Sequence, residues 1–143
     1  APGSPGWQAE ALPTTAGYHH GLFLDLDPEG VPELAFADSA CLWWSRRASA
    51  GWTIAPIGES CSDGDWPVFR RDARGQRHFV YLQGWATRRV EYQRQTGPRW
   101  EAQEIAPWFN WWTHPALALD PVDTPRIAFG DNYRLRLYHA ELY

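Results

Sequence analysis

The sequence lacks most of the features that assign a protein to a functional class directly. It has no methionine, and its two cysteines are too few for a disulfide-rich scaffold. No apolar run approaches the roughly 20 residues of a membrane-spanning helix, so we expect no membrane span. The net charge is −4 rather than strongly positive, so we expect no nucleic-acid partner.

Motifs for catalysis and for cofactor binding are also missing. The sequence contains no nucleophile elbow, phosphate-binding loop, dinucleotide fingerprint or zinc motif. We therefore expect no cofactor and no resident metal. An enzymatic role would rest on analogy of fold alone.

Tryptophan, glycine and proline are what the sequence has in quantity. It contains 10 Trp, 12 Gly and 12 Pro. Glycine and proline disfavour helices, whereas tryptophan favours strands. At 143 residues the chain is long enough for one domain with a sizeable core. The composition predicts an all-β protein rich in turns.

Three tryptophans mark an internal repeat. Trp7, Trp52 and Trp100 are 45 and 48 residues apart, and an aspartate that opens a turn follows each of them after 20 residues. An apolar residue lies seven positions beyond each aspartate, and an aromatic residue lies nine positions beyond it. In chain order the aspartates are Asp27, Asp72 and Asp120, the apolar residues Leu34, Phe79 and Ile127, and the aromatic residues Phe36, Tyr81 and Phe129.

Each copy of the repeat predicts four short antiparallel strands. Between the first two strands, the turn aspartate is expected to bond its own backbone, and a glycine three positions later takes the positive φ. Four such strands at a period of about 45 residues are typical of a β-propeller blade. The sequence resembles bacterial β-propeller repeat proteins, whose pattern is an apolar strand, Asp-x-x-Gly-x-Pro, an aromatic strand, Leu-x-Tyr and Gly-Trp. This resemblance covers nearly the whole chain.

The order of the predicted strands indicates how the blades are divided. We expect a single unit over residues 1–143, with a fourth strand at 7–12, blade one at about 20–57, blade two at about 66–105, and strands one to three of blade three at about 113–143. Three blades cannot close a ring, because natural propellers have about four to eight. We predict a six-bladed ring formed by a homodimer, in which the N-terminal strand of one chain completes the last blade of the other. The alternative is a piece cut from a longer propeller.

One rim of the predicted propeller gathers most of the aromatic and polar candidates. The loops from strand four to the next strand one, and from strand two to strand three, share this rim. Aromatic residues on loops indicate a binding surface, although they can also cover the ends of blades. The candidate ligand-binding residues are Tyr18, His20, Asp65, Trp66, Trp85, Trp108, Asn110, Trp111, Trp112, His114, Asp131 and Tyr133.

Carbohydrate is the ligand that this rim predicts. The C–H faces of sugar rings pack on indole rings, while Asp and Asn side chains bond the hydroxyl groups. Short-chain oligomeric propeller lectins have this architecture, although the Arg, Glu and Trp triplet of the fucose-binding type is not repeated from blade to blade. One alternative is an enzyme of the polysaccharide lyase or hydrolase type, or a small-molecule or metal binder, with a single central-funnel site at His20, Asp65 and His114. Another is a protein–protein interaction module. We favour binding over catalysis.

The two cysteines fall at the same predicted rim. Cys41 opens a third strand, and Cys61 lies in a loop from strand four to strand one. A disulfide between them is predicted, with two unpaired thiols as the alternative. A disulfide indicates a secreted or extracytoplasmic protein.

Overall fold

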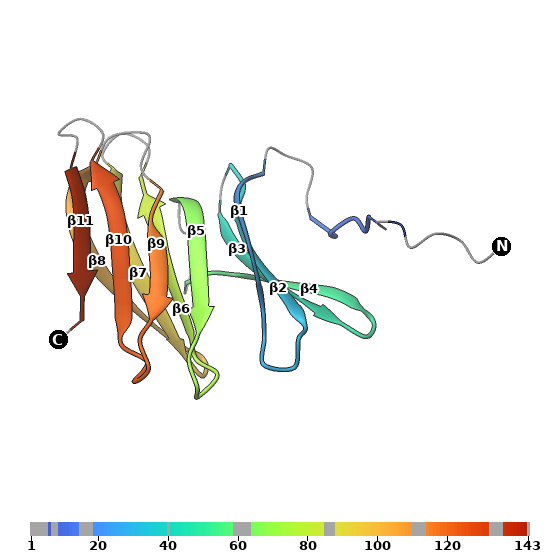
Figure 1. Ribbon diagram of the computed structural model, residues 1–143. Helices are drawn as coiled ribbons and strands as arrows, with labels where there is room; N and C mark the ends of the chain where they lie inside the picture. Colours follow the sequence, from blue (N-terminus) through green and yellow to red (C-terminus); the bar gives the residue numbers. More distant parts are fainter. Residues whose placement is uncertain are drawn as a thin grey trace.

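A computed structural model shows how the three repeats fold. It describes residues 6, 9–14, 19–39, 41–58, 64–84, 88–109, 114–131 and 136–142, with the side chains of 108, 109 and 131 outside the description. The described residues form eleven strands and no helix (Figure 1). The predicted all-β class is confirmed.

The strands form three antiparallel sheets, one for each repeat. In each sheet the strands follow one another in sequence order, and neighbours along the chain pair with each other. The first sheet contains β1 (His20–Leu26), β2 (Pro32–Ala37), β3 (Leu42–Ala48) and β4 (Gly51–Pro56). The second contains β5 (Gly64–Arg71), β6 (Arg77–Gln83), β7 (Arg88–Thr96) and β8 (Arg99–Phe109). The third contains β9 (Ala116–Leu119), β10 (Pro125–Asp131) and β11 (Arg136–Glu141).

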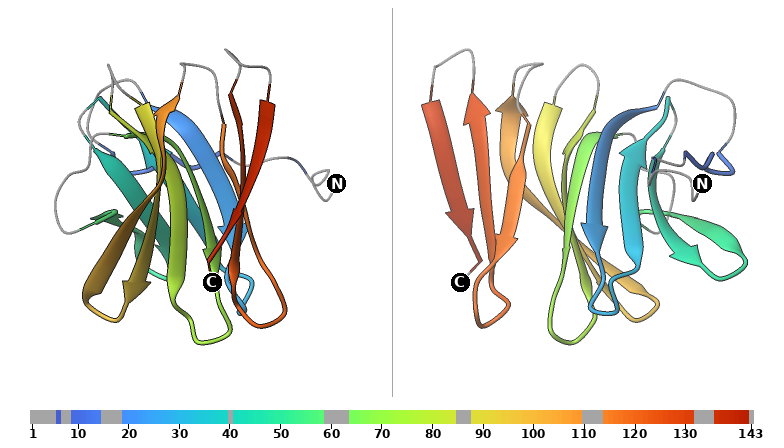
Figure 2. Two further views of the ribbon diagram at one scale, coloured as in Figure 1. Left: turned by 90° about the vertical axis from the view of Figure 1, so that its left-hand side faces the viewer. Right: turned by 45° about the vertical axis from the view of Figure 1, so that its right-hand side comes forward.

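The first strands of the three sheets lie side by side. Figures 1 and 2 both show β1, β5 and β9 next to one another, with the remaining strands of each sheet extending away from them. The hairpins β1–β2, β5–β6 and β9–β10 all turn at the same end of the molecule. The other ends of these strands, which flank the loops predicted to share a rim, lie at the opposite end of the molecule from the hairpin turns.

The predicted turn chemistry is present in all three repeats. One carboxylate oxygen of each turn aspartate accepts the backbone N–H groups of the residues two and four positions later, at 2.7 to 3.0 Å. The residue three positions after the aspartate has a positive φ, which is 77° at Gly30, 79° at Gly75 and 65° at Asp123. The third copy thus holds an aspartate where the other two have glycine.

The core consists of two apolar clusters, one at each interface between sheets. The first cluster contains Ala35, Ala37, Leu42 and Ile57 from the first repeat with Phe69, Phe79 and Tyr81 from the second. The second contains Val80, Leu82, Val90 and Tyr92 from the second sheet with Leu117, Ile127 and Phe129 from the third. The second sheet is therefore covered on both faces.

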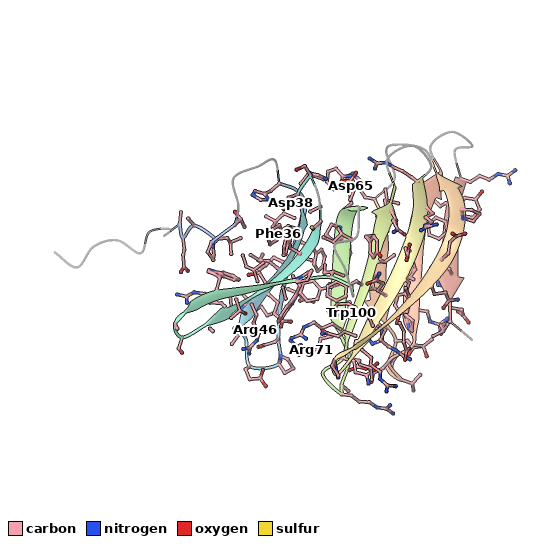
Figure 3. All side chains as sticks on the ribbon, turned by 180° about the vertical axis from the view of Figure 1, so that it is seen from behind. Phe36, Asp38, Arg46, Asp65, Arg71 and Trp100 are labelled. Atoms are coloured by element: carbon pink, nitrogen blue, oxygen red, sulfur yellow. The ribbon has the colours of Figure 1, made fainter. Side chains whose placement is uncertain are left out.

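The first interface also contains a buried carboxylate. Glu33 is 1% exposed and contacts Arg71 of β5, while the guanidinium groups of Arg77 and Arg46 lie 3.6 and 3.7 Å from its Oε1. The guanidinium of Arg77 also lies over the ring of Trp44, 3.8 Å from its centroid. Figure 3 shows Arg46 and Arg71 near one end of the sheets and Asp38 and Asp65 near the other.

The N-terminal segment was predicted to form a strand at 7–12 that pairs with a second chain. The described residues 9–12 belong to no strand in the single chain. Glu10 pairs with Arg47 of the first sheet at 3.0 Å. Pairing of this segment with the last sheet of a second chain stays a prediction. In the described part of the chain, no helix is long and apolar enough to cross a membrane.

Candidate functional site

Four of the twelve predicted ligand-binding residues have described side chains. They are His20, Asp65, Trp66 and His114, and the structure brings them together in two contacting pairs at the ends of β1, β5 and β9. Trp108 lies in β8 and Asp131 ends β10, but their side chains are outside the described part. Tyr18, Trp85, Asn110, Trp111, Trp112 and Tyr133 lie outside the described residues altogether.

Asp65 and His20 form the first pair. His20 begins β1, and Asp65 is the second residue of β5. His20 Nε2 contacts Asp65 Oδ1, and the carboxylate is 6% exposed. On its other oxygen, Asp65 accepts a hydrogen bond of 2.6 Å from Arg88 Nη2, at the start of β7. Both oxygens of this buried carboxylate are thus engaged, one with His20 and the other with Arg88.

Trp66 and His114 form the second pair. Their rings are stacked with centroids 3.9 Å apart and an interplanar angle of 23°. Trp66 has a φ of 54°, and the pairing of β5 with β6 shifts register between Asp65 and Val68. A left-handed backbone is uncommon for a bulky residue and stores strain. The stack therefore depends on a β-bulge that turns the indole of Trp66 toward His114.

The first repeat has glycine at the position that corresponds to Trp66. Gly21 has a φ of 62° and lies in the same kind of register shift, between His20 and Phe23. A Cβ added to Gly21 would lie 2.6 Å from the backbone N and Cα of Trp66. Glycine is required at this position because β1 and β5 approach each other so closely. The same close approach fixes the position of the Trp66 backbone.

A groove runs beside the stacked pair. It has a volume of about 280 Å³ and an open mouth. Its walls combine the indole and the imidazole with apolar side chains and backbone from β1 and β5. The lining residues are Gly21, Leu22, Phe23, Trp66, Pro67, Val68, His114 and Pro115.

A second cavity, on the first sheet, was not predicted from the sequence. Asp38 Oδ2 accepts a hydrogen bond of 2.7 Å from the indole Nε1 of Trp43, and Asp38 Oδ1 accepts one of 2.7 Å from the backbone N–H of Cys41. The cavity measures about 190 Å³, and Pro13 and Thr14 of the N-terminal segment form part of its wall with Phe36 and Trp43. The available signal was Asp38 itself, a polar residue two positions after the repeat aromatic Phe36, whereas Trp43 reads as an ordinary strand residue.

Cys41 is disulfide-bonded. Cys61, its predicted partner and the only other cysteine in the sequence, lies outside the described residues. The pairing of Cys41 with Cys61 therefore stays a prediction. Among the described residues, no group of three or more His, Cys, Asp or Glu side chains is placed to hold a metal ion.

The chemistry of the described site suits recognition. The groove offers an aromatic face, apolar contacts and imidazole nitrogens, whereas Asp65 is buried and committed to His20 and Arg88. Comparison with protein-family models, with curated proteins and with solved structures found no match to this chain.

Proposed function

We propose that the chain binds carbohydrate in the groove beside Trp66 and His114. The conformation of Trp66 is the observation that carries this proposal. Its φ of 54° is one that glycine adopts readily, and the first repeat has Gly21 there. A tryptophan kept in a strained backbone conformation, with its ring at a groove, is a common feature of ligand sites.

The groove offers the contacts that a sugar ring needs. The apolar C–H face of a sugar packs on an indole ring, and neutral hydroxyl groups bond well-placed nitrogens and oxygens. His114, which lines the groove and is stacked on Trp66, supplies ring nitrogens next to this face. The groove volume of about 280 Å³ is near the lower end of small-ligand pockets, which suits one sugar unit.

Binding is favoured over catalysis by the state of the carboxylate. A general base needs an oxygen that can reach the proton of a substrate or water. Both oxygens of Asp65 already accept from partners, and the residue is 6% exposed. We assign Asp65 the role of positioning His20.

The proposed function includes a finer architecture. In this proposal the three sheets are propeller blades, and the groove is part of the funnel around which β1, β5 and β9 stand (Figure 2). Six blades are completed by a second copy of the chain. Secretion is also proposed, because a disulfide at Cys41 suits an oxidising compartment.

Titration of the protein with simple sugars tests the function. The probes are D-glucose, D-galactose, D-mannose, L-fucose and N-acetylglucosamine, with binding followed by saturation-transfer NMR and calorimetry. We expect at least one to bind the wild-type protein. Trp66→Gly should weaken its binding about tenfold or more, because the stacking surface is lost.

Trp66→Gly is a sharp probe because the backbone there already has a φ that suits glycine. Trp52→Phe is the matched control, since Trp52 lies at the start of β4 and outside the groove lining. Far-UV circular dichroism checks that both variants are folded. Failure of all five sugars to bind, or unchanged affinity in Trp66→Gly, would overturn the proposal.

A further inference from the structure

The three sheets use their two faces in a fixed order. We call the face of each sheet that points toward the following sheet its back face, and the face that points toward the preceding sheet its front face. At the first interface, Ala35, Ala37 and Leu42 are on a back face and Phe69, Phe79 and Tyr81 on a front face. At the second interface, Val80, Leu82 and Val90 are on a back face and Leu117, Ile127 and Phe129 on a front face.

In the described part of the single chain, no sheet lies against the front face of the first sheet, although Leu34 and Phe36 of β2 on this face are buried. Leu24, three residues before its turn aspartate, corresponds to Phe69 and Leu117 in the other repeats. Phe69 is 1% exposed and Leu117 is 3% exposed, but Leu24 is 59% exposed. Leu22 and Leu26, on the same side of β1, are also exposed. A position that is core in two repeats is thus open to solvent in the first.

The back face of the third sheet is open in the same way. Leu137 pairs in register with Gly130, as Val90 pairs with Leu82 in the second sheet and Leu42 with Ala37 in the first. Val90 and Leu42 are 0% exposed, whereas Leu137 is 91% exposed. The core position of the repeat is therefore solvent-exposed at this end too.

The two open faces differ in the size of their side chains, as the two faces of a covered interface do. At the first interface, large side chains of a front face, such as Phe79 and Tyr81, meet small ones of a back face, such as Ala35 and Ala37. The open front face likewise presents three leucines. The open back face presents small residues around Leu137, namely Ala116, Ala118, Ala128 and Gly130.

From this correspondence we infer that the front face of the first sheet binds the back face of the third sheet of a second copy of the same chain. The contact repeats the one between successive sheets within the chain, and two copies that meet twice in this way close a six-sheet ring. The N-terminal segment is already beside the front face, because Pro13 and Thr14 share a cavity with Phe36 and Ile54. This inference rests on the proposed blade architecture and is independent of sugar binding.

Light scattering after size exclusion, over a wide range of protein concentration, tests the contact. We expect a mass of twice 16.4 kDa for the wild-type chain. Leu24→Arg on the front face and Leu137→Arg on the back face should each weaken the dimer about a hundredfold or more and give a mass of 16.4 kDa, because each places a charge in both copies of the contact.

Val122→Arg is the matched control. Val122 is 78% exposed but lies in the turn between β9 and β10, outside both faces, so this variant should remain a dimer. All three replaced residues are solvent-exposed in the single chain, so circular dichroism should show an unchanged fold. Sugar titration of Leu24→Arg tests the groove separately from assembly.

Three outcomes would overturn the inference. A wild-type mass of 16.4 kDa at every concentration would show that the faces do not bind a second copy. A dimer that Leu24→Arg weakens and Leu137→Arg does not would show that two front faces meet each other. A mass above two chains would show that the faces join without closing at two copies.

Discussion

One repeat position has a different environment in each of the three sheets. It lies six residues after the turn aspartate, on the back face, and is occupied by Glu33, His78 and Arg126. Glu33 is buried against arginines of the second sheet, and His78 is buried where the third sheet covers it. Arg126, whose back face is open, pairs with its own turn aspartate, Asp120, at 2.9 Å. The type of residue at this position therefore depends on what covers the back face of each sheet and is not fixed by the repeat.

The two buried residues at this position, Glu33 and His78, offset the free-energy cost of their burial in different ways. Glu33 is surrounded by the guanidinium groups of Arg71, Arg77 and Arg46. Burial lowers the pKa of His78, and a hydrogen bond of its Nε2 with Asp72 only partly offsets this. Its Nδ1 lies 2.6 Å from the hydroxyl of Tyr92, whose pKa burial raises to about 12. The first interface thus surrounds a carboxylate with guanidinium groups, while in the second burial favours the uncharged forms of His78 and Tyr92.

Removing the buried charge of Glu33 should have the largest effect. Glu33→Gln would leave the surrounding arginines without their carboxylate and lower the free energy of unfolding by about 3 to 5 kcal/mol, as measured by urea denaturation. Glu101→Gln is the matched control, because Glu101 pairs with Arg94 at an exposed site and should contribute less than about 1 kcal/mol. Equal losses in the two variants would contradict the assigned role of Glu33.

Reduction of the disulfide at Cys41 should have the next largest effect. Cys41 precedes Leu42 of the first core cluster, and a bridge to Cys61 closes a loop of about 20 residues, which is worth about 3 kcal/mol in the chain-entropy model. Urea denaturation with and without reductant measures the loss. A thiol assay on the unfolded, unreduced protein should find no free thiol, and two free thiols would refute the bridge.

Enlarging a small residue of a back face distinguishes the covered faces from the open one. Ala35→Leu should overpack the first interface and cost about 1 to 3 kcal/mol of unfolding free energy. Ala128→Leu changes the corresponding residue of the open face and should alter the stability of the single chain by less than about 0.5 kcal/mol. Both are best measured in the Leu24→Arg background, which removes the proposed association of chains from the comparison. If Ala128→Leu lowered the free energy of unfolding as much as Ala35→Leu, the back face of the third sheet would not be open in the single chain.

The smallest effect we expect is a pH dependence from His78. Because burial lowers the pKa of His78 in the folded chain below its ordinary value of 6.5, the folded state disfavours the protonated form. Stability from this residue is fully present above pH 6.5 and is lost as pH falls through 6.5 toward the folded pKa. Urea denaturation at a series of pH values should show this decline in the wild type and a weaker one in His78→Gln. If the free energy of unfolding declined equally with falling pH in the wild type and in His78→Gln, the decline would come from other groups.

The features that follow from local chemistry were predictable from the sequence. An aspartate that bonds the backbone two and four residues later needs no distant partner, so the turns at Asp27, Asp72 and Asp120 could be placed, and the strands on either side followed. His20 and Asp65 could be expected to lie near each other because each stands at the start of the first strand of its sheet.

The features that depend on contacts between residues distant in the sequence were not predictable. Arg88 reads as one of many surface arginines until β7 is placed, and only then does it reach Asp65. Alternating patterns place apolar residues inside, so Glu33 could not be recognised as buried. The stack of Trp66 on His114 follows from a bulge, and one shifted residue reverses the direction of a side chain.

The fixed order of front and back faces has a consequence for the limits of assembly. A single contact between unlike faces of two copies leaves one front face and one back face unused, so the contact by itself does not limit the number of copies. The rotation between successive sheets alone then decides whether the growing chain of copies returns to its starting point or continues as a helical filament. Substitutions at the two interfaces within the chain, such as a larger residue at Ala35, would change this rotation. They could therefore alter the number of copies in an assembly without touching the surface at which the copies meet.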